Sequence, residues 1–130
     1  MMRKILLTLT CALALATIST MVMAKTTIAL NPTGVNPNAT GSATITVSSG
    51  EQSFDVQVGK LATATYTLFV DGNNITTFTT GKGGSAQVRF DTNPHGQVQL
   101  LPSVLNPVSN IKLVEIKAAS NGEVVLNGSF

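Results

Sequence analysis

Cysteine, histidine and tryptophan are almost missing from this chain of 130 residues. It contains one Cys, one His and no Trp, and Cys11 lies inside an apolar run near the start of the sequence. A disulfide framework requires paired cysteines, and a copper or zinc carrier requires clustered His, Cys or Met ligands. Every methionine lies at or before Met23. The composition therefore excludes a disulfide scaffold and a carrier of soft metal ions.

The first 24 residues have the pattern of an export signal. Arg3 and Lys4 precede an uncharged apolar run, and the small-residue pattern at 22–24 is one after which signal peptidases cut. The run is shorter than the ~20 residues that cross a bilayer, and no comparable run follows it. We predict a signal peptide over 1–24, a mature chain that begins at Lys25 without a membrane span, and a periplasmic, cell-surface or extracellular location.

Charge is scarce as well. Charged residues make up 11% of the chain, against about 25% in typical soluble domains. Loss of the signal leaves six basic residues facing six acidic ones, scattered without a patch, so the mature net charge is zero. We therefore predict no nucleic-acid partner. Little repulsion opposes association at zero net charge, which makes a protein partner or self-association the expected kind of contact.

Apolar and polar side chains alternate with a period of two along the mature sequence, which is typical of strands. Thr, Val, Ile and Phe alternate with small polar residues, and turn residues at 48–51, 71–74 and 120–122 each separate two alternating runs. These breaks predict three hairpins. Two prolines within 102–110 predict a loop that crosses between sheets.

The spacing of these runs predicts about seven or eight strands and no sustained helix. We predict an all-β fold, an antiparallel immunoglobulin-like β-sandwich. Residues 25–38 are predicted to form an N-terminal lead-in arm, and 39–130 a single sandwich domain.

The stretch 38–47, Asn-Ala-Thr-Gly-Ser-Ala-Thr-Ile-Thr-Val, precedes a strand that ends at Lys60-Leu61 and another at Tyr66. This order resembles the start of chordin-type domains in secreted bacterial proteins, over roughly the first half of the mature chain. The His-x-His element of that family is absent here. The resemblance implies an immunoglobulin-like sandwich, and a fold does not by itself imply a function.

The residues of an active site do not come together in the sequence. His95 lies in a Pro-Gly turn four residues after Asp91, and no serine stands in a Gly-x-Ser-x-Gly elbow. No spacing marks two carboxylates as a glycosidase pair. We predict that the chain is not an enzyme and has no catalytic, cofactor-binding or metal-binding residues. Calcium binding at the turns 71–74 and 91–96 stays open. In the loop that begins at Asp91, however, Pro102 occupies the twelfth position, where a calcium loop needs a bidentate Glu.

Two aromatic residues stand out of phase with the predicted core. Phe69 lies between Leu68 and Val70, and Phe78 lies between two threonines. Because the Asp71-Gly72 hairpin joins their strands, both rings can project from one face. We predict an interaction patch at Phe69 and Phe78, with cover by a second sheet or by the lead-in arm as the alternative.

Together these features predict an exported, non-enzymatic β-sandwich with a structural, adhesive or protein-interaction role at the cell envelope or outside it. The alternative is a small-ligand or carbohydrate-binding module that uses the face with Phe69 and Phe78.

Overall fold

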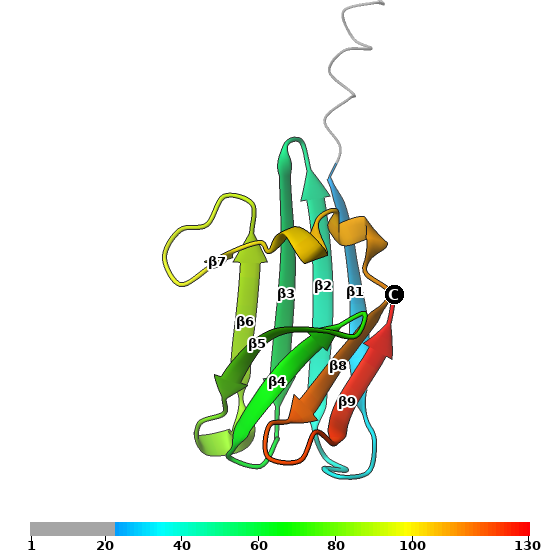
Figure 1. Ribbon diagram of the computed structural model, residues 1–130, viewed down its shortest axis with the longest axis vertical. Helices are drawn as coiled ribbons and strands as arrows, with labels where there is room; N and C mark the ends of the chain where they lie inside the picture. The colour runs from blue at the N-terminus through cyan, green and yellow to red at the C-terminus, as the bar shows by residue number, and fades with distance from the viewer. Residues whose placement is uncertain (1–22) are drawn as a thin grey trace, which may run out of the picture.

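The computed structural model describes residues 23–130, and these residues fold into β-strands joined by turns and short 3₁₀ segments (Figure 1). The all-β prediction is therefore confirmed for this part of the chain. The predicted signal peptide falls almost wholly on residues 1–22, outside the described residues. No helix within 23–130 has the length and apolar character needed to span a membrane.

Nine strands and three 3₁₀ segments follow one another along the chain. In order they are β1 (Ala24–Pro32), β2 (Thr40–Ser48), β3 (Glu51–Gly59), β4 (Thr65–Val70), β5 (Asn73–Thr79), η1 (Lys82–Gly84), β6 (Ala86–Asp91), β7 (Gln99–Leu100), η2 (Ser103–Leu105), η3 (Val108–Asn110), β8 (Leu113–Ala118) and β9 (Val124–Ser129).

All nine strands belong to one hydrogen-bonded sheet in the order β5-β4-β8-β9-β1-β2-β3-β6-β7. The sheet curls into a half-barrel, so that β4 and β5 cross in front of β2 and β3 (Figure 1). Seven neighbouring pairs are antiparallel, while β6 and β7 are parallel. The observed sheet is thus mixed and has nine strands, where the sequence predicts an antiparallel arrangement of seven or eight.

The three predicted hairpins are present. The turn after Ser48 joins β2 to β3, the Asp71-Gly72 turn joins β4 to β5, and the Asn121-Gly122 turn joins β8 to β9. Gly72 and Gly122 have φ of 84° and 74°, which glycine adopts without a steric penalty. These hairpins form because alternating apolar runs face one side and the turn residues accept left-handed backbone.

The segment predicted as a lead-in arm, 25–38, carries most of β1. This strand lies inside the sheet, where it pairs with β2 from Ala24 to Leu30 and with β9 at Asn31 and Pro32. It is the strand through which the two halves of the sheet are continuous (Figure 1). Leu30, which is 2% exposed, anchors β1 to the core.

One hydrophobic core lies between the two halves of the curled sheet. Phe54 and Val56 of β3 face inward from one half, and Leu68 of β4 and Ile116 of β8 face inward from the other. All four are at most 1% exposed. Burying each such side chain stabilises the fold by about 1.5–3 kcal/mol.

The predicted loop over 102–110 crosses one end of the half-barrel and leads from β7 to β8 (Figure 1). Its residues Leu105 and Val108 are buried in the core. The Gln52 side chain ties this loop to β3, because its amide nitrogen donates to Asn106 Oδ1 at 3.0 Å and its amide oxygen accepts from Val108 N at 2.8 Å.

Candidate functional site

Phe69 and Phe78 lie on opposite faces of the sheet. Phe78 is directly opposite Tyr66 on the neighbouring strand, and their rings stack with centroids 5.9 Å apart. Tyr66 is 2% exposed and faces the core, so Phe78 also faces inward. Phe69 lies three residues after Tyr66 on β4 and therefore points outward. The structure does not bring the two predicted patch residues together.

A β-bulge explains this separation. Phe69 pairs with Asn74, but Leu68 pairs with Thr76, so Ile75 is an extra residue on β5. Without the bulge, Phe78 would lie opposite Thr65, on the same outward face as Phe69. One inserted residue moves every later side chain of the strand to the other face.

The ring of Phe69 is covered by a cation from its own chain. Lys117 Nζ lies 4.1 Å from the ring centroid, within cation–π distance. Both residues are half-buried on the outer face of the sheet. A sugar that stacks on Phe69 would first have to displace this ammonium group.

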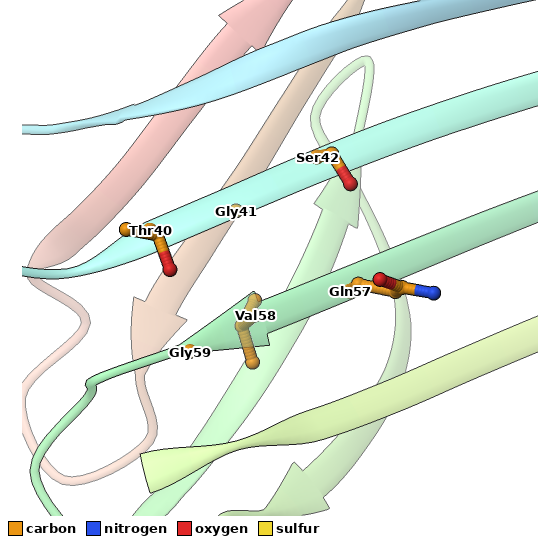
Figure 2. Close-up of a pocket in the computed structure, with 6 residues that line it drawn as sticks. All are labelled: Thr40, Gly41, Ser42, Gln57, Val58 and Gly59. Atoms are coloured by element: carbon orange, nitrogen blue, oxygen red, sulfur yellow. The ribbon is translucent and has the colours of Figure 1, made fainter. Parts of the chain in front are cut away.

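Where β2 begins and β3 ends, the outer face of the sheet carries neutral polar groups instead of rings. Thr40 and Ser42 of β2 and Gln57 of β3 surround a shallow hollow of about 270 Å³ (Figure 2). Gly59 allows the Thr40 hydroxyl to lie over the backbone of β3, because a Cβ atom there would be 2.9 Å from Thr40 Oγ1. The hydroxyl and amide groups that line this hollow can form hydrogen bonds with a polar ligand that lies in it. The alternating hydroxyls of β2 are the sequence signal for this face, which lies apart from the predicted patch at Phe69 and Phe78.

Further along the same face, side chains of neighbouring strands bind one another. The hydroxyl oxygens of Thr27 and Thr44 are 2.9 Å apart across β1 and β2. Asp55 forms an ion pair with Arg89, Nε to Oδ2 at 3.4 Å, and accepts a hydrogen bond from the Gln87 amide at 3.2 Å. These cross-strand pairs stabilise the sheet by a few tenths of a kcal/mol each.

His95 and Asp91 are engaged in their own turn. The Asp91 carboxylate accepts a hydrogen bond from Asn93 N at 2.9 Å, and His95 Nδ1 lies 2.9 Å from the Asn93 carbonyl oxygen. A hydrogen bond from a backbone N–H to the side chain of an Asp two residues earlier is typical of turns.

Asp71 is likewise engaged, at the β4–β5 turn. Its carboxylate accepts from Leu113 N at 2.8 Å and from Lys112 N at 3.1 Å. It thereby anchors the hairpin to the start of β8. Within residues 23–130, no three His, Cys, Asp or Glu side chains gather where they could hold a metal ion.

Tyr66 is an ionisable residue whose pKa is shifted by its surroundings. Its hydroxyl donates a hydrogen bond to the Ala62 carbonyl oxygen at 2.7 Å, and burial raises the pKa of the phenol above its ordinary value of 10.0. The ring forms part of an open hollow between Val35, Ala64 and Ala118. The buried phenol acts as a neutral donor that ties β4 to the preceding turn.

β5 forms one of the two ends of the sheet in the described part of the chain. β5 ends the strand order, and β4 is the strand with which it pairs. Its sequence, Asn-Asn-Ile-Thr-Thr-Phe-Thr, contains neither a charged residue nor a proline. Edge strands that avoid pairing carry such residues. The missing charge is visible in the sequence, but the position of this strand at the edge depends on long-range pairing.

Comparison with known proteins identifies no relative of this chain. The chain matches no protein-family model, no curated protein and no solved structure.

Proposed function

We propose that this chain is an exported, non-enzymatic β protein that acts by protein–protein contact, in a structural or adhesive role at the cell envelope or outside it. The open edge of β5 carries the proposal. Its unpaired main-chain N–H and C=O groups form a template that accepts an extended strand. An uncharged edge of seven residues adds no electrostatic barrier to that contact.

The use of the charged and titratable side chains supports the same role. Asp71 anchors a hairpin, Asp91 and His95 stabilise a turn, and Asp55 joins two strands. These groups support the fold, whereas a catalytic role requires a group directed at a reacting atom.

Export is the part of the proposal that comes from residues 1–24. The direct experiment is mass spectrometry of the product secreted by the native host, combined with fractionation of its cells. We expect a mature chain that begins at Lys25 and is found outside the cytoplasm. A full-length, uncleaved chain in the cytoplasm would contradict the proposal.

We further propose that the curled sheet is related to the immunoglobulin-like sandwich of chordin-type domains. The resemblance of 38–47 supports this relation, and so does the arrangement of two facing halves around one core. A solved structure whose strands superimpose on such a domain in the same connection order would support it, and a different order would oppose it.

The second candidate function is a small-ligand or carbohydrate-binding module. The hollow between Thr40, Ser42 and Gln57 favours it, because hydroxyl and amide groups are the partners that sugar hydroxyls use. Glycan-array binding that is lost on Gln57→Ala, with the fold unchanged, would support this function. Equal binding by Gln57→Ala and the native chain would remove this hollow as the site.

A further inference from the structure

We propose that the open edge of β5 pairs with β5 of a second copy of this chain, so that the two curled sheets join into one antiparallel sheet. This inference rests on the proposed function and names the partner of the same edge. The pairing is isologous, with a two-fold axis that passes between the Thr77 residues of the two copies.

The two ends of the sheet differ in how they avoid pairing. At the far end, β7 has two residues and is followed by Pro102, and the neighbouring β6 carries the exposed Arg89. Short strands, prolines and charges are the devices by which sheet edges avoid association. β5 has only the bulge at Ile75, which leaves Thr76 to Thr79 in regular register with β4.

A second copy is the occupant that the chemistry of β5 favours. Because the strand is uncharged, two copies meet there without like-charge repulsion. The charges of the mature chain also balance to zero, so the approach of two copies has no net repulsion to overcome. A partner that is steered by charge would find no complementary group on this strand.

Thr–Thr pairing across strands is already used within the chain. The hydroxyls of Thr65 and Thr79 are 3.3 Å apart across β4 and β5, and those of Thr27 and Thr44 are 2.9 Å apart across β1 and β2. A two-fold axis between the two Thr77 residues repeats this pairing, since it places each Thr77 directly opposite the second copy's Thr77. This register also keeps the outward faces of both sheets on one side.

The added strand also covers apolar surface that the fold leaves open. Ile75 and Phe78 are only half-buried although they pack against the core. Because contact along a single strand belongs to the low end of interface sizes, we expect a weak dimer whose population depends on concentration.

Disulfide trapping tests the register. The mature chain has no cysteine, because Cys11 precedes Lys25. Thr77→Cys places one thiol at the axis, where directly opposed residues of an antiparallel pair have Cα atoms ~4.5–5.5 Å apart, within the range that a disulfide spans. The matched control is Gln57→Cys, which is also exposed on an outward strand face but lies in the other half of the sheet. Under mild oxidation, we expect the Thr77→Cys dimer to form at least about tenfold faster.

Sedimentation of the mature chain gives the second measurement. We expect the native chain to form dimers as concentration rises, Thr77→Lys to weaken the dimer at least about tenfold, and Gln57→Lys to leave it unchanged. A mixture of Thr77→Lys and Thr77→Glu chains should recover the dimer. Circular dichroism checks that each variant folds.

Equal trapping rates for the two cysteine variants would overturn the proposal, as would a native chain that stays monomeric at the highest soluble concentration. Neither result would contradict export or contact with a different protein, because the location and processing of the secreted product are measured separately.

Discussion

Gly84 lies directly against Leu61, and Leu61 N donates a hydrogen bond to the Gly84 carbonyl oxygen at 3.2 Å. This contact holds η1 against the turn that follows β3. A Cβ atom on Gly84 would collide with the backbone of Leu61, whereas one on Gly83 would meet nothing within 4 Å. Both glycines have positive φ, 84° for Gly83 and 70° for Gly84.

The two glycines therefore give a matched pair of variants. Gly83→Ala should cost about 1–2 kcal/mol of unfolding free energy, because Ala is strained in left-handed backbone. Gly84→Ala should cost about 1–3 kcal/mol more, because its neighbours must also move. Urea denaturation of both variants measures the difference. Equal midpoints would show that Leu61 does not confine Gly84.

Tyr66→Phe should lower stability by about 1 kcal/mol at neutral pH, because the Ala62 carbonyl loses its hydrogen-bond donor. The native chain should also lose stability as the pH rises above 10. The pKa of Tyr66 is raised by burial, so the unfolded chain releases this proton at a lower pH than the folded chain does. Thermal unfolding from pH 8 to 12 should show a smaller alkaline loss in Tyr66→Phe. An identical loss in both proteins would contradict the assignment.

Phe69→Ser and Phe78→Ser should differ, since the rings have different surroundings. Phe78 stacks on Tyr66 and packs against the core, so its replacement should cost about 2–4 kcal/mol. Phe69 contacts Lys117 on the outer face, and its replacement should cost about 1 kcal/mol. Urea midpoints of the two single variants measure both costs. A larger loss of stability for Phe69→Ser than for Phe78→Ser would contradict the assignment of Phe78 to the inner face and Phe69 to the outer face.

The position of Phe78 shows which features of the β4–β5 hairpin can be predicted from the sequence and which cannot. The Asp71-Gly72 turn fixes where β4 and β5 reverse, and the sequence predicts that hairpin. A regular register from that turn would place Phe69 and Phe78 on one face, as predicted. The bulge at Ile75 shifts the register by one residue. No residue type in β5 marks that bulge, and beyond it Phe78 stacks on the buried ring of Tyr66.

Long-range pairing limits the sequence analysis in the same way elsewhere. Hairpins follow from local turns, so β2–β3, β4–β5 and β8–β9 were predictable. β1 carries one fully buried residue, Leu30, and pairs with β9 almost a hundred residues away, so its sequence resembles an arm. The parallel contact of β7 with β6 involves two residues and leaves no periodic signal.

Asp71→Ala should destabilise the chain by about 1–3 kcal/mol, because the backbone amides of Lys112 and Leu113 lose their acceptor. Asp71 also has φ of 50°, a left-handed conformation that Asp and Asn tolerate better than Ala. Asp71→Asn is the matched control, since it keeps an acceptor oxygen and this tolerance. Thermal unfolding should rank the native chain first, Asp71→Asn second and Asp71→Ala last. Equal stability of the two variants would count against the anchoring role.

Residue-resolved amide hydrogen exchange at low and high protein concentration tests most directly whether β5 is the edge through which this protein makes contact. The exchange rates of those amides of Thr76 to Thr79 that point away from β4 should fall as concentration rises, because a second copy pairs with the open edge. Amides of β3, in the interior of the sheet, should exchange equally at both concentrations. Rates along β5 that do not change with concentration, while association occurs elsewhere or does not occur, would contradict the account.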